Sequence, residues 1–319
     1  MGVTGSGKST FIQTATGDRS VGVNHGLRSC TREVEVHSVR IDGFQVNLID
    51  TPGFDDNKRS ETEVLQTIST YLAKASTNQV LLNGIIYVHS IMQTRMGGSG
   101  IRSLGILERL TGSHNLDNIL LVSNMWDALK GTVNNDGQYL TGQQVGELRE
   151  RELQMNPEFW KGLIDQGAHT SRHCGGSWES AHELIRRFLC PESNKGVGRP
   201  MKLLLQMELV DQHKRLEETE VGNYINKKLY EGQQKLEKEI MELRRRHQRS
   251  LDKYGASSGA SPSDIGSQLE EKKKGLNDVR KNSEILGKRV DQLISDHGIK
   301  VATPVGRTSG SHAGLCNVM

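Results

Sequence analysis

Short apolar runs and helix-like patterns alternate along the first 190 residues. Val34–Ile41 alternates apolar and polar positions, as a half-buried strand does, and Asp42-Gly43 forms a turn into a second strand at Gln45–Asp50. Leu82–Ile91 and Asn118–Ser123 are nearly continuous apolar runs, typical of strands buried on both faces of a mostly parallel sheet. Helical patterns precede or separate these strands, at Thr10–Thr16, Thr62–Ala73 and Gly100–Leu110. This order predicts a doubly wound α/β domain over residues 1–190.

The chain changes character after about residue 200. A charged helix is predicted over 191–254, where Leu229, Leu236 and Leu243 recur at every seventh position. Residues 255–264 have the Gly/Ser/Pro composition of a flexible linker, and heptad-like spacing resumes over 265–296. Two interpretations stay open here: a short coiled-coil seam, or a charged helix that folds back on the α/β domain without a partner chain. The Gly, Ser, Pro and Thr of residues 297–319 predict a disordered tail.

Composition narrows the class of protein. With 319 residues, of which 34% are hydrophobic, the chain has room for one core plus a solvated or elongated part, as its mean hydropathy of −0.55 also indicates. The net charge of +3 does not suggest nucleic-acid binding. Four scattered cysteines fit a reducing compartment, and no apolar run approaches the roughly 18 residues of a membrane span. We therefore expect a cytoplasmic protein.

The strongest motif lies at the very start of the sequence. Residues 2–9 read GVTGSGKS, an unbroken match to the phosphate-binding pattern G-x-x-x-x-G-K-[ST]. Glycines allow backbone N–H groups to wrap phosphates, while Lys8 neutralises the β- and γ-phosphates and the Ser9 hydroxyl ligates magnesium. The expected phosphate-binding residues are Gly2, Gly5, Ser6, Gly7, Lys8, Ser9 and Thr10.

Two further motifs follow in order, each directly after a predicted strand. Asp50-Thr51-Pro52-Gly53 places an acid that can hold magnesium through water, and Gly53, whose N–H can reach the γ-phosphate. Asn124-Met125-Trp126-Asp127 has the N-x-x-D form that reads guanine, because the Asp127 carboxylate accepts from the ring N–H and the exocyclic amine together. Met125 replaces the usual lysine of this motif, and Trp126 can supply apolar cover for the base. The motifs together predict GTP or GDP as the ligand, with Mg²⁺.

These motifs make residues 1–190 resemble the septin-like, immunity-associated (IAN/GIMAP-type) branch of TRAFAC-class GTPases. Fungal G-domain proteins of this style carry the same DTPGFDD and MWD elements and an R-M-x-G stretch, here Arg95–Gly98. The resemblance implies a P-loop G domain, a three-layer sandwich, acting as a Mg-dependent GTP switch. It implies Thr31 as a switch threonine that ligates magnesium with Ser9 and Asp50, and Lys8 and Thr31 as the catalytic pair. For the fifth, base-proximal motif the best candidate is Thr170–His173.

Two departures from the family pattern change what is expected. Met1 directly precedes Gly2, so the central strand that comes before the phosphate-binding loop is missing, and its neighbours would be left unpaired. A truncated gene model or a weakly folded short isoform would account for this. Phe54 stands where Ras-like enzymes have a water-orienting glutamine, which predicts slow hydrolysis. Arg95 could act from a facing subunit or be an ordinary surface arginine.

The last four residues, Cys316-Asn317-Val318-Met319, fit the C-a-a-X pattern of farnesylation. A lipid on Cys316 would give weak membrane association. The other expected partner is a second copy of the chain, bound through the G domain or the coiled coil.

Two other functions stay open besides a GTPase switch. One is a scaffold that binds GTP only to assemble, and the other is an ATP-using P-loop enzyme such as a kinase or transport ATPase. The N-x-x-D motif argues against the second.

Overall fold

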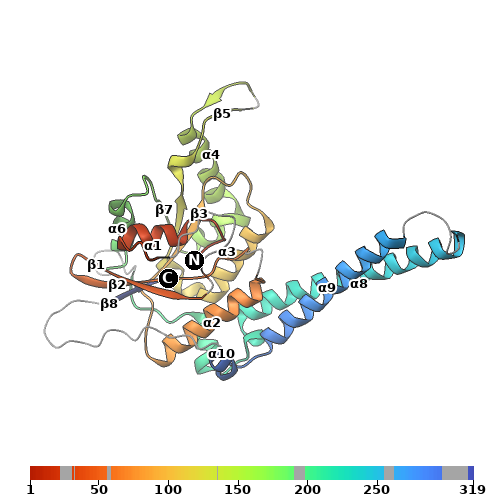
Figure 1. Cartoon of the computed structure of the whole chain (residues 1–319). Coiled ribbons are helices and arrows are strands. Elements are labelled where there is room, and N and C mark those ends of the chain that lie inside the picture. Colours follow the sequence, from red (N-terminus) through yellow and green to blue (C-terminus); the bar gives the residue numbers. More distant parts are fainter. Residues whose placement is uncertain are drawn as a thin grey trace.

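A largely parallel sheet with helices on both faces forms the centre of the molecule in the computed structural model (Figure 1). The structure describes residues 1–21, 31, 33–55, 59–134, 136–189, 198–254, 262–296 and 315–319. The strands of the sheet are β1 (Glu35–Ile41), β2 (Phe44–Asp50), β3 (Ile85–Ser90), β4 (Ile119–Asn124), β7 (His169–Arg172) and β8 (Leu315–Val318). A small ribbon of β5 (Thr132–Val133) and β6 (Tyr139–Leu140) stands apart from it.

The strand order across the described part of the sheet is β1-β2-β8 followed by β3-β4-β7. β1 and β2 are an antiparallel hairpin through Asp42 and Gly43, both at positive φ, and the other pairs are parallel. Backbone hydrogen bonds from Asn83 to Asn317 and from Ile86 to Met319 join β3 to the segment around β8. The two halves are therefore one continuous sheet.

β8 overturns two expectations about the chain. Residues 315–318 are a strand rather than part of a disordered tail, and they lie between β2 and β3, where the missing central strand was expected to leave a gap. The Cys316 side chain is 2% exposed, so it lacks the accessibility that farnesylation of a flexible tail requires. Residues 297–314 lie outside the described residues.

Two hydrophobic cores flank the sheet. On one face α1 (Lys8–Thr16) and α6 (Trp178–Arg186) pack on apolar side chains of β2, β3, β4 and β8. On the other face lie α2 (Glu61–Thr77), α3 (Gly98–Thr111), α4 (Gly142–Met155) and α5 (Gly162–Asp165), with the segments that follow residue 200. α2 begins at Glu61 because Ser60 and Glu63 form a reciprocal capping box. The three-layer α/β fold is confirmed, and the predicted strands are displaced by at most three residues at their ends.

The helical part after residue 200 projects from this domain as a hairpin (Figure 1). α8 (Glu220–Tyr254) runs outward, and α9 (Pro262–Leu286) returns to the domain, followed by α10 (Val290–Asp296). The charged helix begins at Glu220 instead of 191, because residues 203–218 form α7 (Leu204–Gln206) and other short turns that pack into the core.

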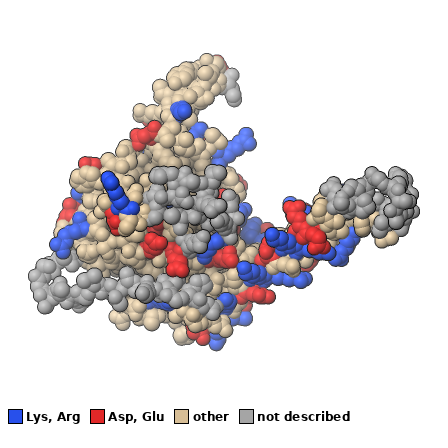
Figure 2. Space-filling model, in the orientation of Figure 1, with Lys and Arg blue, Asp and Glu red and all other residues tan. Residues whose placement is uncertain are grey.

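The heptad positions of α8 and α9 face each other within one chain. Half-buried residues recur along α9 at Leu269, Lys272, Leu276, Val279 and Ser283. Gly275 faces Leu236 of α8, and Lys272 pairs with Glu239 of α8 at 2.7 Å. Figure 2 shows Lys and Arg interspersed with Asp and Glu along this hairpin. No helix in the described ranges is both long and apolar enough to cross a membrane.

Candidate nucleotide site

The loop of residues 2–7 ends where α1 begins, next to the ends of β2 and β3. Gly7 caps α1 at φ 94° without any side-chain hydrogen bond, so the first N–H groups of the helix stay available to an anion. A Cβ on Gly7 would lie 2.4 Å from Asn124 Nδ2, so a larger residue would collide with the neighbouring loop. The sequence motif thus reflects both the helix start and close packing.

Lys8 is the first residue of α1, and its side chain reaches back to this loop. Its Nζ donates to Val3 O at 3.0 Å. A Cβ on Gly53 would lie 2.7 Å from the backbone N of Thr4 and 2.8 Å from Lys8 Nζ, which explains why position 53 carries no side chain. Burial lowers the pKa of Lys8 to about 8, although the Asp50 carboxylate acts in the opposite direction. A half-buried cation beside the N-terminus of a helix is an environment that suits a phosphate.

The three residues expected to hold magnesium converge on one point. Ser9 Oγ donates to Asp50 Oδ2 at 2.7 Å, Thr31 Oγ1 donates to the same oxygen at 3.1 Å, and the two hydroxyls are 3.1 Å apart. Asp50 is 2% exposed and its other oxygen, Oδ1, has no partner within the described chain. An all-oxygen set with one carboxylate suits Mg²⁺, which keeps water and phosphate ligands of its own.

Other orphaned polar atoms surround the loop. The buried hydroxyls of Thr4, Ser6 and Thr51 also lack partners among the described residues. Because unpaired buried polar groups are costly, their concentration around one loop indicates a polar ligand. Of the remaining predicted phosphate-binding residues, Gly5 and Thr10 are exposed and Gly2 is buried beside β3.

The N-x-x-D loop lies against the phosphate-binding loop. Asn124 Nδ2 donates to Ser6 O at 3.1 Å, and its Oδ1 accepts from the Met125 N–H at 2.8 Å. Met125 adopts φ 67°, with its sulfur 3.2 Å from Ser90 Oγ. Asp127 Oδ2 accepts from the Gly175 N–H at 2.8 Å. The two loops that should hold phosphate and base are thus joined directly.

Gly175 also bears on the fifth motif. β7 ends at Arg172, and Gly175 in the loop that follows it contacts Asp127. The predicted stretch Thr170–His173 therefore lies directly before the loop that contacts the acid expected to bind the base. His173 is buried beside Phe11, and burial lowers its pKa.

A partly buried network behind this loop was not anticipated from the sequence. Glu150 of α4 accepts from Ser123 Oγ at 2.8 Å and from Arg172 Nε at 2.7 Å. The Arg172 guanidinium lies 4.3 Å over the Trp126 ring, and Trp126 Nε1 donates to Ser123. The network fixes Trp126 from three elements. Glu150 carries no sequence signal of its own, because it is one of three glutamates among the charges of α4.

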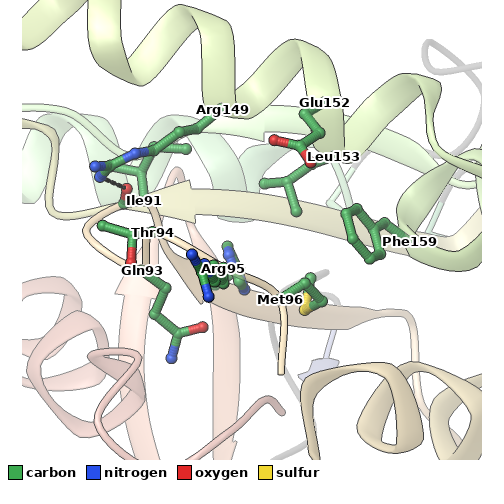
Figure 3. A pocket seen from close by; sticks show the side chains of 10 residues that line it. Ile91, Gln93, Thr94, Arg95, Met96, Arg149, Glu152, Leu153 and Phe159 are labelled. Atoms are coloured by element: carbon green, nitrogen blue, oxygen red, sulfur yellow. Dashed lines mark hydrogen bonds between the residues drawn. The ribbon is translucent and has the colours of Figure 1, made fainter. Parts of the chain in front are cut away.

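Phe54 and Arg95 differ sharply in environment. The Phe54 side chain is 1% exposed in the core, while its backbone accepts from Thr4 N at 2.7 Å. Arg95 is exposed in the loop after β3, at a pocket of about 250 Å³ whose other wall is α4 (Figure 3). In that wall Arg149 donates to Ile91 O at 2.8 Å. Asp56, at the end of the predicted switch segment Asp50–Asp56, lies outside the described residues, as do residues 22–30 and 32 on either side of Thr31.

Comparisons with known proteins match part of the chain to GTP-binding proteins. Residues 1–97 match the family model described as 50S ribosome-binding GTPase. A 100-residue stretch is 31% identical to GTP-binding protein A of Dictyostelium discoideum, covering 31% of this chain and 21% of that protein. The chain thus spans about a fifth of the length of this curated relative. The fold is that of a P-loop GTPase G domain.

Solved structures that the chain matches include Toc33 from Arabidopsis thaliana. The form in complex with Mg²⁺ and GMPPNP is 18% identical, with 62% of this chain and 84% of that chain covered and a TM-score of 0.45. The form with GDP and Mg²⁺ has the same identity and coverage, with a TM-score of 0.46. None of these matches singles out the septin-like or IAN branch.

Proposed function

We propose that this G domain binds GTP and GDP together with Mg²⁺ and hydrolyses GTP slowly, acting as a switch. The observation that carries the proposal is the convergence of the Ser9, Thr31 and Asp50 oxygens beside Lys8. Those residue types, held at those distances next to a helix N-terminus, suit a triphosphate and its metal.

In this proposal the chain binds phosphate through backbone and charge. The N–H groups of Gly2, Gly5, Ser6 and Gly7, with those of the first turn of α1 at Ser9 and Thr10, surround the phosphates, and Lys8 neutralises their charge. Gly53 offers its N–H to the terminal phosphate from the opposite side. Ser9, Thr31 and Asp50 would hold Mg²⁺, which supplies charge neutralisation between the β- and γ-phosphates when bound.

Asn124 and Asp127 serve the base in different ways. Asn124 braces the phosphate-binding loop through Ser6, while the Asp127 carboxylate accepts from the guanine N–H groups. Adenine would leave this carboxylate without its donors. The Trp126 ring, fixed by Arg172, supports the same loop.

Slow turnover is supported by Phe54, because its side chain is packed in the core rather than directed at an attacking water. Thr31 and the segment from Asp50 to Asp56 would be ordered by the γ-phosphate and released after hydrolysis. α2 follows this segment and touches the hairpin, since Ser60 Oγ donates to Asn282 Oδ1 at 2.6 Å. A change in the segment therefore has a direct path to α9.

Single-turnover hydrolysis of radiolabelled GTP by the dilute full chain tests this function. We expect Mg-dependent turnover well below the 1–10³ s⁻¹ typical of enzymes, roughly at or under 10⁻² s⁻¹. GTP binding with no turnover at any protein concentration would instead support the assembly scaffold. No binding of GTP or GDP at all would refute the proposal.

A further inference from the structure

Residues 315–319 lie in a channel between β2 and β3. β8 pairs in parallel with β2, from Gln45 opposite Leu315 to Leu48 opposite Val318. On its other side, Asn83 N donates to Asn317 O at 2.7 Å, and Ile86 N donates to Met319 O at 2.7 Å. This segment therefore has backbone partners on both edges, as a central strand does.

The same channel continues into the phosphate-binding loop. Beyond Met319, β3 pairs with Met1, whose nitrogen donates to Ile86 O at 2.7 Å and whose carbonyl accepts from Val88 N at 2.9 Å. The two ends of the chain thus follow one another along β3, and the N and C marks lie close together in Figure 1. Residues 315–319 occupy the stretch of sheet immediately before Met1.

Side chains of the segment are matched to both faces of the sheet. Cys316 and Val318 pack in the core beneath α1 and α6, and Met319 packs in the opposite core. Asn317 is recognised by polar groups: its N–H donates to Asn83 Oδ1 at 2.9 Å, its Nδ2 to Leu81 O at 2.9 Å, and its Oδ1 accepts from Asn47 at 3.0 Å. Leu315, at the mouth of the channel, is 44% exposed.

We propose that the channel between β2 and β3 is a binding site for one parallel β-strand, filled in cis by residues 315–319, and that its occupancy sets the affinity of the phosphate-binding loop for nucleotide. An empty channel would expose two rows of unpaired N–H and C=O groups and the apolar walls of both cores. It would also remove the support directly ahead of Met1 and Gly2, whose backbone positions begin the loop. The nucleotide part of the proposal rests on the proposed function, whereas the occupancy part does not.

Occupancy is measured by alkylation of the full, unmodified chain. Cys316 is buried and Cys174 is exposed, so peptide mapping after a pulse of iodoacetamide gives both rates in one sample, each compared with its rate in urea. We expect the native chain to protect Cys316 by at least about tenfold and Cys174 far less. Alkylation of Cys316 at its unfolded rate would overturn the proposal, whether or not nucleotide binds. Loss of protection on dilution would show a strand supplied by a second copy and would overturn occupancy in cis.

The coupling between occupancy of the channel and affinity for nucleotide is measured with two matched variants. Val318→Asp places a charge in the core and should expose Cys316 and weaken GDP binding by at least about tenfold, whereas Leu315→Asp, at the exposed position of the same strand, should do neither. A synthetic peptide of sequence LCNVM, added in excess to the Val318→Asp protein, should restore part of the affinity. Exposure of Cys316 with GDP affinity unchanged would refute the coupling. If Val318→Asp fails to fold, the alkylation rates of the unmodified chain still decide occupancy.

Discussion

At the scale of single residues, the candidate site is a small set of oxygens that meet near the half-buried Lys8. Lys8, Ser9 and Asp50 were identifiable from the sequence because their spacing within motifs fixes their chemistry. Their meeting point with Thr31 was implied only by resemblance, since 19 residues separate Thr31 from Asp50. The Glu150–Arg172 pair could not be predicted, because no local pattern distinguishes a buried glutamate that pairs with an exposed arginine from two ordinary surface charges.

Replacing Ser9 with alanine should weaken GTP binding only when magnesium is present. The lost interaction is that of the Ser9 hydroxyl with the metal; taken at the size of a hydrogen bond to a charged group, about 1.5–3 kcal/mol, it is worth roughly ten- to a hundredfold in affinity. Titration of a fluorescent GTP analogue in Mg²⁺ and in EDTA measures the difference. Ser113→Ala, an exposed serine at the far end of the sheet, is the control. An equal loss in both buffers would contradict a metal role for Ser9.

Nucleotide affinity should fall as the pH rises through about 8. Burial lowers the pKa of Lys8 to about 8, so the free protein loses this positive charge above that pH, whereas phosphate favours the charged form. Binding then requires proton uptake, and affinity declines by up to about tenfold per pH unit. Calorimetry between pH 7 and 8.7 measures this slope. In Lys8→Arg the charge persists and the slope should vanish; a flat profile in the unmodified protein would contradict the assignment.

At the scale of elements, periodicity predicted what local sequence determines. The strands and helices of residues 1–190 follow from runs of five or more patterned positions, and the hairpin seam from heptads. β8 could not be predicted, because it has only four residues and its partners on β2 lie 270 positions earlier in the chain. The composition around it indicated disorder, and tertiary pairing overrode that indication.

The base of the helical hairpin should contribute more to stability than its middle. Leu286 is fully buried in the core shared with α2, whereas Leu276 is half-buried in the seam between α8 and α9. We expect Leu286→Ala to lower the free energy of unfolding by about 2–5 kcal/mol and Leu276→Ala by roughly 1 kcal/mol. Urea denaturation followed by circular dichroism compares them. Equal losses would show that the whole hairpin folds as one unit with the G domain.

At the scale of the molecule, the nucleotide end of the sheet, α2 and the hairpin form one connected path. The hydroxyl of Ser60, which caps α2, donates to Asn282 of α9, and Glu63 of α2 pairs with Lys281 of α9. α2 itself follows the DTPG segment of the site. The proposed switch of the Asp50–Asp56 segment would reach the projecting hairpin along this path.

Hydrolysis per molecule should rise with protein concentration if a second copy completes the site. The only exposed cation of the R-M-x-G stretch is Arg95, so Arg95→Ala should remove the rise, while Arg151→Ala on the surface of α4 should retain it. Turnover assays over a hundredfold range of concentration measure this. A rate that is already fast and independent of concentration would contradict it.

The central claim is that the phosphate-binding loop and the N-x-x-D turn select guanine nucleotide. The most direct test is a competition assay in which GTP or ATP displaces a bound fluorescent GDP analogue. We predict that ATP competes at least about a hundredfold more weakly than GTP, because adenine leaves the Asp127 carboxylate without its donors. Asp127→Ala should remove most of that preference, and Asp136→Ala, an exposed acid in the β5–β6 turn, should keep it. Equal competition by ATP and GTP in the unmodified protein would contradict the account.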